Sequence, residues 1–385
     1  MNILYVSQWF SSSGGGGEVL FMQIARGIAE QGHNVHVISH KLADFNEDDI
    51  GNVKIHRVNP LLSNFPPSYF QNIGYILSAT WLGLRIIKQH KIDVMHVNNF
   101  TPIIVGTILS KICKIPLVKT IHVVFCATPN YWNNWSKQLN VSRFTSWVGP
   151  LFEKLTLKLP ADIIHTVSNS TKMDLIKFNA KSKVKVIPNL VNLSFYDNWN
   201  KKKTYEDTVL FVGRLAFNKN LNVVISSFEK VIKKIPNAKL VVIGDGPMSE
   251  EWKKIAYNIG LEDKIVFTAF VPTDKKMDFF SKCSALVLPS ITEGLPTVVL
   301  ESFAMSTPVI LSDIPPHRDI VKDGVDGFLV ASNDIEKWSE KIIYLLSNKD
   351  ACRKMGLNGR SKVEKDFSSQ SVINKFESLY KDVVH

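Results

Sequence analysis

The sequence predicts an α/β protein with two doubly wound domains, each holding a parallel sheet between helices. The chain has 385 residues, of which 45% are hydrophobic and 21% charged, so there is room for two separate cores. Short apolar strands alternate with helical segments through the first half, and this alternation restarts after the polar segment 192–207. We therefore expect a first domain over 1–191, a linker over 192–207 and a second domain over 208–368.

The first domain begins with the strand NILYVS, a run of glycines and a helical pattern over residues 19–31. A second strand completes one strand–helix–strand unit. The further apolar strands are NVHVISH, DVMHV, PLVKTIH, DIIHTVS and VKVIPN. A last helical pattern, over 369–385, follows the second domain, and we expect it to pack back on the first.

The second domain repeats this organisation, with helical patterns between its strands. Its strands are TVLFVGRL, KLVVIGDG, KIVFTAF, ALVLPS and PVILSD. Ligands of doubly wound sheets bind at the carboxyl ends of the strands. We therefore expect a central cleft that the two domains face, lined by the loops that follow their strands.

The positive charge is concentrated in the first half of the chain. Residues 1–190 hold 19 Lys and Arg against 10 Asp and Glu, whereas the remainder holds 27 against 25. Such a field attracts anionic lipid, nucleic acid or phosphorylated substrates, although a lysine-rich surface can also exist without a partner. Because no nucleic-acid recognition motif accompanies the charge, we expect no nucleic-acid partner.

The cysteines and the amino terminus indicate the compartment. The four cysteines are far apart and form no CxxC, which suits a reducing environment, and no HExxH suggests a metal site. The sequence MNILYVSQWF lacks the features of a signal peptide, and no apolar stretch is long enough to span a bilayer. We predict a cytoplasmic protein without metal or cofactor, with the inner face of the cytoplasmic membrane as a further candidate location.

Four glycines, at positions 14–17, follow the first strand and precede a helix. Glycine lets the backbone approach a ligand closely, and a helix amino terminus favours an anion. We predict phosphate binding at Gly15, Gly16 and Gly17; a plain flexible turn is the alternative. The second strand ends in Ser39-His40-Lys41 instead of an acid, which argues against NAD.

A second candidate anion site is the loop after TVLFV, with Gly213, Arg214 and Lys219. Arginine offers a planar fork for phosphate oxygens and lysine a point charge. Together they could hold a diphosphate and offset the charge that develops as it leaves. Two solvated surface cations are the alternative.

The stretch SITEGLPTVVLE contains two carboxylates, Glu293 and Glu301, around a predicted helix start. We expect the helix to begin near Leu295, with Gly294 before it and Pro296 in its first turn. The N–H groups of Leu295, Thr297 and Val298 would then be free for a phosphate or sugar hydroxyl. Glu301 has apolar neighbours and needs a partner, either a ribose diol or a structural salt bridge; Glu293 alternatively complements the helix dipole.

A series of short motifs runs along essentially the whole chain. It begins with the N-terminal strand, the Gly-rich loop and GHNVHVIS, and it continues in order with TIH, VSNSTK, VIPN, FVGRL, VIGDGP, EGLPTVVLE, PVILSD and DGVDGFLV. The pattern resembles the retaining nucleotide-sugar glycosyltransferases of family 4, whose fold of two Rossmann-like domains is called GT-B. The resemblance implies an acceptor-side first domain and a nucleotide-sugar-binding second domain. It also implies roles for matching residues. For the diphosphate, it implies that Gly15 and Gly16 face it and that Arg214 and Lys219 clamp it. For the donor sugar, it implies contacts from Glu293 near the 3-hydroxyl and from His122 near the 6-hydroxyl. For the nucleoside, it implies that Glu301 binds the ribose and that Phe270 and Val271 lie against the base.

Four positions depart from the family pattern. Val123 stands where aspartate usually follows the histidine. Ala269, Ser306 and Asn220 stand where glycine is usual, and of these residues asparagine tolerates left-handed backbone best. Without the resemblance, His122 would be taken as a satisfied histidine at a strand end.

The resemblance implies a hexosyltransferase that moves a sugar, most commonly from a UDP-sugar, to an acceptor hydroxyl. No DxD pair is present for a metal, so fixed cations and amides must stabilise the leaving diphosphate. The acceptor could be lipid-linked or a cell-surface glycan precursor. A nucleotide-sugar epimerase of the same fold and a non-catalytic sugar-nucleotide-binding protein are the alternatives.

The segment 131–158 resembles the family least. Aromatic residues and cations alternate along it, and its second half has an amphipathic helical pattern around Pro150. Such a helix suits the interface of a membrane, which would make this a peripheral membrane protein. Packing against the first sheet is the alternative.

Overall fold

The computed structural model describes residues 1–10, 16–41, 49–50, 52–59, 68–138, 143–180 and 182–384. The chain forms two compact units, and each is described by itself. Unit 1 comprises Met1–Ala127, Val148–Asn189 and Ser369–His385, and unit 2 comprises Thr128–Trp147 and Leu190–Ser368.

Unit 1 is built on an eight-stranded sheet in the order β3-β4-β2-β1-β5-β6-β7-β8. Its strands are β1 (Asn2–Val6), β2 (Asn34–His40), β3 (Asp49–Ile50), β4 (Val53–Val58), β5 (Val94–Asn98), β6 (Leu117–Ile121), β7 (Ile163–Thr166) and β8 (Lys183–Val186). All pairs are parallel except β3 with β4 at one edge. The sequence predicted the parallel strands but missed β3 and β4, because neither has a recognisable apolar run.

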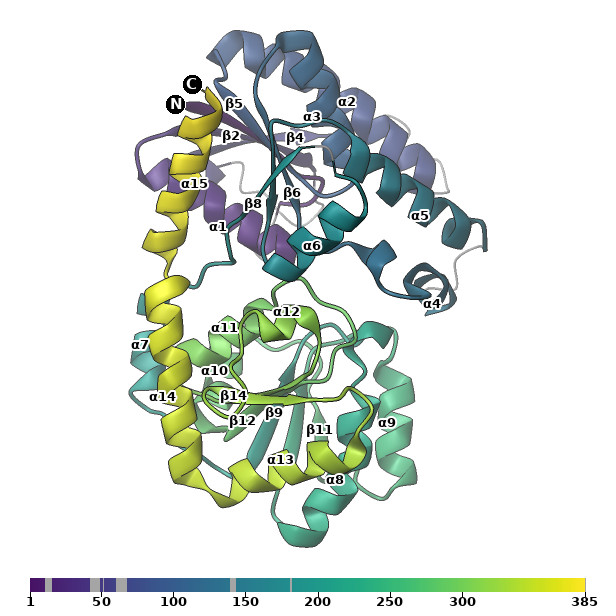
Figure 1. The fold of residues 1–385 in the computed structure, drawn as a ribbon, viewed down its shortest axis with the longest axis vertical. Helices are drawn as coiled ribbons and strands as arrows, with labels where there is room; N and C mark the ends of the chain where they lie inside the picture. Colours follow the sequence, from purple (N-terminus) through teal and green to yellow (C-terminus); the bar gives the residue numbers. More distant parts are fainter. Residues whose placement is uncertain are drawn as a thin grey trace. The chain divides into compact units, whose positions relative to one another are not determined.

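Helices cover both faces of this sheet, and the alternation of side chains along β1 explains how. Leu4 and Val6 belong to the core beneath α2 (Ser68–His90) and α3 (Thr101–Cys113). Tyr5, between them, points to the other face, where its ring contacts Phe21 of α1 (Gly16–Glu30) and Tyr380 of α15 (Ser369–Val384). Figure 1 shows α1 beside α15 and α2 beside α3.

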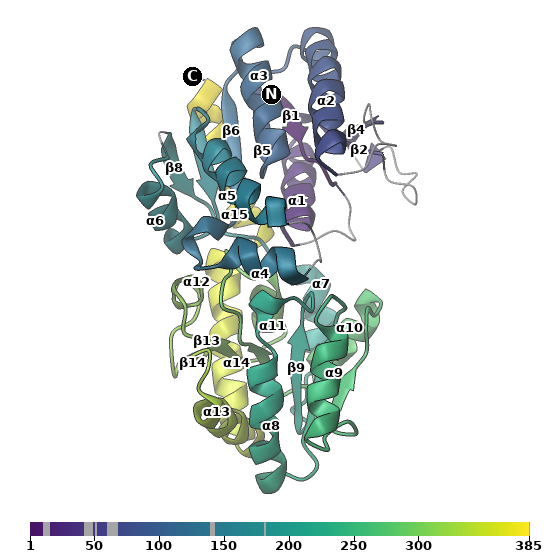
Figure 2. The ribbon, with the colours of Figure 1, turned by 90° about the vertical axis from the view of Figure 1, so that its right-hand side faces the viewer.

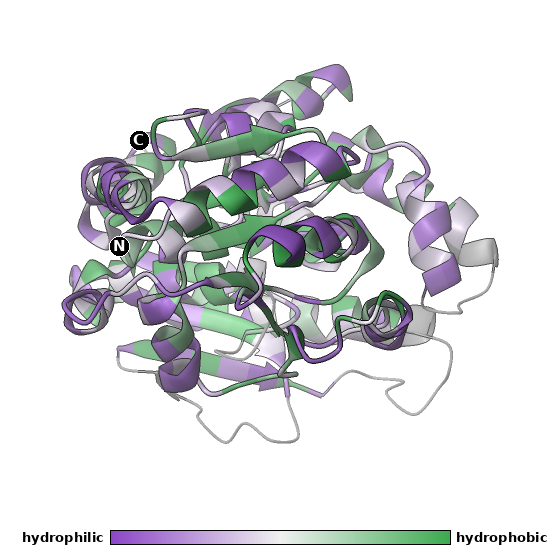
Figure 3. Cartoon of the chain, turned by 90° about the horizontal axis from the view of Figure 1, so that it is seen from below, coloured by the Kyte–Doolittle hydropathy of each residue, from purple (hydrophilic) through white to green (hydrophobic). Residues whose placement is uncertain are grey.

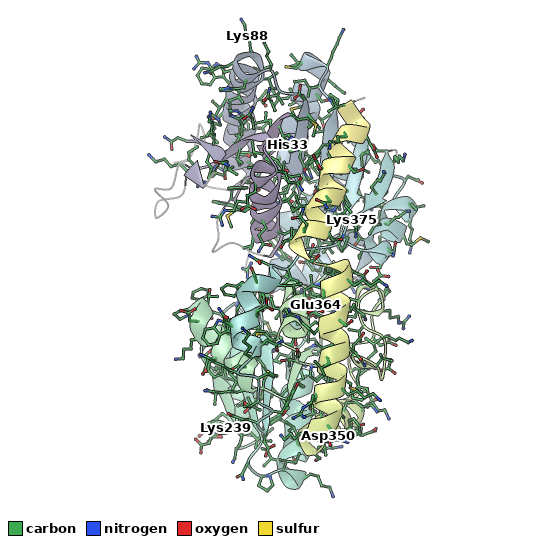
Figure 4. All side chains as sticks on the ribbon, turned by 90° about the vertical axis from the view of Figure 1, so that its left-hand side faces the viewer. His33, Lys88, Lys239, Asp350, Glu364 and Lys375 are labelled. Carbon is green, nitrogen blue, oxygen red and sulfur yellow. The ribbon has the colours of Figure 1, made fainter. Side chains whose placement is uncertain are left out.

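The final helix, α15, belongs to unit 1 although it follows the whole of unit 2 in sequence. His33, which is labelled in Figure 4, lies 3.2 Å from the Glu377 carboxylate of this helix. Val372, Ile373 and Phe376 are buried on the side of α15 that faces α1 and the sheet.

Unit 2 holds a six-stranded parallel sheet in the order β11-β10-β9-β12-β13-β14. Its strands are β9 (Thr208–Val212), β10 (Lys239–Ile243), β11 (Ile265–Phe267), β12 (Ala285–Leu288), β13 (Val309–Ser312) and β14 (Gly327–Val330). The helices around it are α7 (Leu193–Asn200), α8 (Asn222–Lys234), α9 (Ser249–Asn258), α10 (Thr273–Lys282), α11 (Thr297–Ala304), α12 (Pro315–Arg318), α13 (Ile335–Ser347) and α14 (Lys349–Asp366). Figure 2 shows α8 and α9 side by side. Figure 3 shows apolar residues along the strands and hydrophilic residues on the outer surfaces of the helices.

The boundaries between the units differ from those expected. Segment 192–207 is not a free linker, because it forms α7, which packs on α10 and α11 of unit 2. Thr128–Trp147, expected in the first domain, belongs to unit 2, where α4 (Tyr131–Gln138) lies against the short helix η2 (Phe217–Lys219). Aromatic contacts between distant parts of the chain caused this second difference, and sequence periodicity does not report them.

A chain of buried hydrogen bonds crosses unit 1. The Ile187 carbonyl can only accept, so His165 donates to it through Nε2 at 2.8 Å. The direction of every further bond follows from that one: Thr120 donates to His165 Nδ1 (2.8 Å), His96 Nε2 donates to Thr120 (2.6 Å), and Tyr380 donates to His96 Nδ1 (2.6 Å). Tyr5 then donates to Tyr380 at 2.7 Å. These directions hold for neutral rings, and burial lowers the pKa of both histidines.

This network predicts that acid destabilises the protein. Burial holds the pKa of His165 at about 4 and that of His96 well below its ordinary value of 6.5. Below pH 6.5 the unfolded chain takes up protons that the folded chain refuses, so protons favour unfolding. Each histidine should lower the free energy of unfolding by about 1.4 kcal/mol per pH unit from pH 6.5 toward its folded-state pKa. Urea unfolding at pH 7, 6 and 5 measures this slope, and His165→Asn should reduce it. Equal stability at all three pH values would contradict the neutral network.

Candidate active site

The candidate site of unit 2 lies where the strand order of its sheet reverses. The neighbouring strands β9 and β12 have connections that leave in opposite directions, which makes this the topological switch point of the sheet. The loop after β9 carries Gly213, Arg214 and Lys219, and the loop after β12 carries Ser290 and Glu293. The fold therefore brings together two loops that are more than 70 residues apart in sequence.

Two glycines of the motif VIGDGP give the loop after β9 its shape. A Cβ on Gly244 would lie 2.0 Å from the Gly213 carbonyl oxygen, and a Cβ on Gly246 would lie 2.5 Å from that of Leu215. Both glycines also have positive φ angles, 133° and 159°. The backbone of this second loop, after β10, thus fixes the backbone on either side of Arg214. This role of the motif was not predicted from the sequence.

Lys219 and Glu293 form an ion pair at the switch point. The Lys219 Nζ donates to Glu293 Oε1 at 2.5 Å, and the Ser290 hydroxyl donates to the same oxygen at 2.7 Å. The two charged side chains are only 17% and 12% exposed, so the pair is weakly screened by solvent. The structure thus unites two predicted catalytic residues from different loops.

The electrostatics of this pair keep Glu293 ionised. Burial alone would raise its pKa, but the charge and hydrogen bond of Lys219, with smaller contributions from His317 and Ser290, hold the pKa of Glu293 below its ordinary value. His317, on α12, is fully buried, and burial lowers its pKa to about 4. Its Nδ1 donates to the Ser312 carbonyl at 2.7 Å, and the lowered pKa makes the imidazole neutral.

Arg214 differs from Lys219 because its side chain is exposed. Within the described part of the chain it forms no ion pair. It follows Gly213, whose added Cβ would lie 3.8 Å from the Lys219 side chain. The loop thus offers one cation already neutralised by a carboxylate and a second that is open to a ligand.

The helix after Glu293 starts two residues later than predicted. Helix α11 begins at Thr297, and Pro296 precedes it in an extended conformation with ψ 117°, although its carbonyl accepts a hydrogen bond from Val299 at 3.1 Å. Gly294 is buried, and Leu295 is 7% exposed. Leu295 is engaged in a contact within the protein, so we do not assign its N–H to a ligand. No described residue accepts from the N–H of Thr297 or Val298, which leaves two donors at this helix end.

Glu301, one turn into α11, has a cationic partner. Lys276 of α10 donates to both carboxylate oxygens, at 2.9 and 3.1 Å, and the two side chains are about one-fifth exposed. Tyr196 of α7 lies close enough for Glu301 to contribute to its raised pKa, although burial is the larger cause. Glu301 thus forms a salt bridge with Lys276, which was the predicted alternative to a ribose contact. Lys276 was not predicted.

The residues expected at the base lie at the end of β11. Phe270 is 81% exposed, whereas Val271 is 7% exposed and can offer a ligand mainly its backbone. Ala269 has a φ of 55°, in the left-handed region that favours glycine. Its carbonyl accepts from Gly244 at 2.9 Å, which ties this segment to the loop behind Arg214.

In unit 1, the candidate residues gather around His122, just after β6. Gly15 lies outside the described residues. The predicted helix start at residue 19 placed Gly16 and Gly17 in a loop before the helix. This was wrong, because they are the first two residues of α1. A Cβ on Gly17 would lie 3.1 Å from the His122 ring, so a larger residue would fit only if the ring shifted by a few tenths of an ångström. This steric role is independent of the predicted phosphate contact.

His122 is held by the loop after β5. Its Nε2 lies 2.9 Å from Oδ1 of Asn98, and its backbone N–H donates to Oδ1 of Asn99 at 3.4 Å. Burial, with a smaller contribution from His165, lowers the pKa of His122 to about 3. His122 is therefore neutral at physiological pH, and it cannot supply a positive charge to a ligand.

The loop after His122 is fixed from α5 (Arg143–Lys158). The Glu153 carboxylate is buried and accepts from the N–H groups of Phe125 and Cys126, at 2.6 and 3.0 Å. The fully buried Lys119 of β6 donates to the carbonyls of Leu157 and Leu159 at the end of this helix. These contacts explain why a charged residue occurs on the inner face of α5, and neither was predicted.

The segment 128–147 contributes aromatic residues to unit 2. The Thr128 hydroxyl donates to that of Thr292 at 2.8 Å, next to Glu293, and the rings of Tyr131 and Phe217 lie 5.3 Å apart. The segment that begins at Thr128 thus reaches both loops of the switch point, and Tyr131, in the region that resembles the family least, makes one of the two contacts. Over the described residues, no group of three His, Cys, Asp or Glu side chains is placed to hold a metal.

The sequence is similar to those of known glycosyltransferases. Residues 14–195 match Glycosyltransferase Family 4, and residues 195–362 match Glycosyl transferases group 1. A relative from Escherichia coli, UDP-Gal:alpha-D-GlcNAc-diphosphoundecaprenol alpha-1,3-galactosyltransferase, is 25% identical over 338 residues, which cover 83% of this chain and 84% of that protein.

Two solved structures share the fold over nearly the whole chain. Sucrose-phosphate synthase from Thermosynechococcus elongatus has a TM-score of 0.83 at 19% identity, covering 99% of this chain and 98% of its own. Anabaena HepE, solved in complex with UDP and glucose, has a TM-score of 0.77 at 17% identity, covering 99% and 100%. The chain is a glycosyltransferase: it belongs to family 4, with the GT-B fold of two Rossmann-like α/β units.

Proposed function

We propose that this glycosyltransferase is a retaining, metal-independent hexosyltransferase that uses a UDP-sugar. The observation that carries the proposal is the half-buried pair of Lys219 and Glu293 next to the exposed Arg214. This arrangement offers cations to a leaving diphosphate and an ionised carboxylate to a sugar hydroxyl. The relative named for UDP-Gal and the structure solved with UDP support the choice of nucleotide.

In the proposed reaction, the bond between the anomeric carbon and the diphosphate oxygen breaks while the acceptor oxygen bonds to that carbon. The proton of the acceptor hydroxyl passes to the departing phosphate, and UDP and the new glycoside are released. Attack on the face from which the diphosphate leaves retains the configuration. Arg214 and Lys219, with the N–H groups of Thr297 and Val298, are proposed to stabilise the growing negative charge.

The other predicted residues complete the donor site. Glu293 is proposed to accept from a hydroxyl of the donor sugar, and Glu301 from the ribose. Phe270 offers an exposed ring to the base. His122, with Gly15 and Gly16, is proposed to act on the transferring sugar and the diphosphate from unit 1.

For the acceptor, we propose a lipid-linked sugar or another cell-surface glycan precursor. The relative with diphosphoundecaprenol in its name supports a lipid-linked substrate. Helix α5 also has an outer apolar face, on which Trp147, Leu151 and Leu155 are each at least half exposed. The exposed Lys154 and Lys158 lie on the same helix. Aromatic and aliphatic side chains next to lysines suit an anionic membrane surface.

An epimerase of the same fold remains the second candidate, because it would use the same nucleotide-sugar residues without an acceptor. Incubation of the pure protein with labelled UDP-sugars separates the two activities. An epimerase converts the donor sugar without lipid extract, whereas a transferase labels a product only when the extract is present. A binding protein without catalysis gives neither result.

Removal of both clamp cations should stop turnover. We expect Arg214→Ala with Lys219→Ala to lower kcat by about 10²-fold or more, because the charge on the departing diphosphate loses its fixed partners. Donor affinity should change less. The control is Lys253→Ala, which removes an exposed lysine of α9 that pairs with Glu250 three residues away. Thermal melting of the double variant checks the fold, and unchanged turnover in a folded variant would contradict the clamp.

Glu301 should matter for nucleotide binding, and Lys276 provides its control. Glu301→Ala should weaken the binding of UDP by about 10- to 100-fold, the value of a charged hydrogen-bond acceptor. Lys276→Met removes the salt bridge but leaves the carboxylate, so it should cost much less. Calorimetric titration with UDP, and with GDP and ADP for comparison, measures both effects. Equal losses in the two variants would assign Glu301 a structural role.

Membrane contact through α5 can be tested without a substrate. None of the described helices is long and apolar enough to cross a bilayer, so the proposed contact is with the surface. We expect the protein to sediment with vesicles that contain anionic lipid, and Trp147→Ala with Leu151→Ala to reduce the bound fraction several-fold. The control is Met173→Ser, which removes an exposed apolar residue from α6 (Asn169–Lys177). If the control variant reduced the vesicle-bound fraction equally, the proposed contact through α5 would be wrong.

A further inference from the structure

The amide of Asn98 determines which nitrogen of His122 carries the proton. Asn98 is the last residue of β5, and it is 6% exposed. Its Oδ1 is 3.1 Å from the backbone nitrogen of Asn99 and 2.9 Å from Nε2 of His122. A backbone N–H can only donate, so the atom it meets must be the amide oxygen and not the amide nitrogen. This contact fixes the orientation of the amide without reference to the imidazole.

The direction of the second contact then follows. An amide oxygen can only accept, so the Nε2 of His122 must carry a hydrogen and donate it to Asn98. The neutral ring then has its lone pair on Nδ1. The histidines of the buried network, His96 and His165, carry their protons on the same nitrogen for an equivalent reason, whereas His317 in unit 2 carries its proton on Nδ1.

The Nδ1 atom of His122 has no hydrogen-bond partner among the described residues, and it is not one of the fully enclosed polar atoms of the structure. The Nε2 side of the ring, by contrast, is closed by Asn98 and by the tight contact with Gly17. The ring is therefore held by one nitrogen and presents the other. The titratable groups that act on it are His165 and His96, both buried and neutral.

We propose that Asn98 is a positioning residue that holds His122 as a neutral acceptor for a hydroxyl of the transferring sugar. The inference rests on the proposed function, and it adds the polarity of the contact and the class of group that fits it. A lone pair on Nδ1 accepts from a hydroxyl but repels a carboxylate or phosphate oxygen. The side of the site that His122 lines is thus built for neutral sugar hydroxyls.

The neutral amide is essential to this arrangement. A carboxylate at position 98 would stand about 3 Å from Nε2 and would favour the charged imidazolium, in which both nitrogens donate. An apolar side chain of similar size would leave the ring without a preferred tautomer. Asn98→Asp and Asn98→Leu therefore separate the charge of His122 from its orientation.

The tautomer can be measured directly by nitrogen NMR of the histidine side chains. We expect the His122 signals to match the pattern of a proton on Nε2, as for His165, and to differ from the opposite pattern of His317. His122→Gln assigns the signals. Addition of UDP-glucose should move the Nδ1 signal of His122 and leave that of His165 in place. A proton on Nδ1, or an Nδ1 signal that bound UDP-glucose does not move, would overturn the proposal.

Kinetics of the position 98 variants provide the second test. Asn98→Asp should give kcat/KM a new decline toward low pH that the wild type and Asn98→Leu lack, because protonation of His122 removes the acceptor. Asn98→Leu should lower kcat/KM at every pH. Asn99→Leu, the matched control, should leave the ring signals unchanged, because Asn99 contacts only the backbone of His122. If the Asn98→Asp profile superimposed on that of the wild type, the proposal would be wrong. Failure of UDP to bind at all would instead contradict the proposed function.

Discussion

The ion pair between Lys219 and Glu293 is the interaction on which the candidate site of unit 2 depends. It joins the loops after two neighbouring strands, and both charges are largely withdrawn from water. A charge buried in this way is tolerated only with a partner, so neither residue can be understood alone. In the proposed reaction, a diphosphate that approached Lys219 would compete with Glu293 for the same ammonium. Glu293 would then be available to a hydroxyl of the donor sugar. The exposed Arg214 would let binding begin before that exchange.

Backbone contacts that exclude a side chain hold these charges in place. Gly244 and Gly246 support the loop that carries Arg214, and Gly17 lets α1 approach His122. At Gly244 and Gly246 a methyl group would collide with backbone atoms, and at Gly17 it would crowd the ring. The glycines thus matter mainly because they have no side chain. The close backbone packing that this permits fixes the positions of the charged residues. This explains why residues that never need to touch a ligand recur in the motifs of the sequence.

The sequence alone predicted most strands and helices, because apolar periodicity and turn residues are local signals. It also flagged Ala269, Ser306 and Asn220 as replacements of glycine, and all three have positive φ angles. It did not predict that Lys276 pairs with Glu301, that Glu153 holds the loop after His122, or that segment 128–147 belongs to unit 2. Each of these depends on a contact between distant residues, which no local pattern encodes. The start of α11 was misplaced because Pro296 suits both the first turn and the residue before it.

The two units carry different chemistry, which suits the two parts of the nucleotide sugar that we propose as donor. Unit 2 supplies full charges, namely Arg214, Lys219 and two carboxylates. Around His122, unit 1 supplies neutral polar groups instead, and burial lowers the pKa of His122 and His165 so that both are uncharged. Such a division has a physical reason. A departing diphosphate gains charge and benefits from fixed cations, whereas sugar hydroxyls remain neutral and need only direction. A cation next to the sugar would also oppose the positive charge that builds on the anomeric carbon. The low pKa of His122 is thus a requirement of the chemistry proposed for unit 1, and its burial against Gly17 and Asn98 meets that requirement.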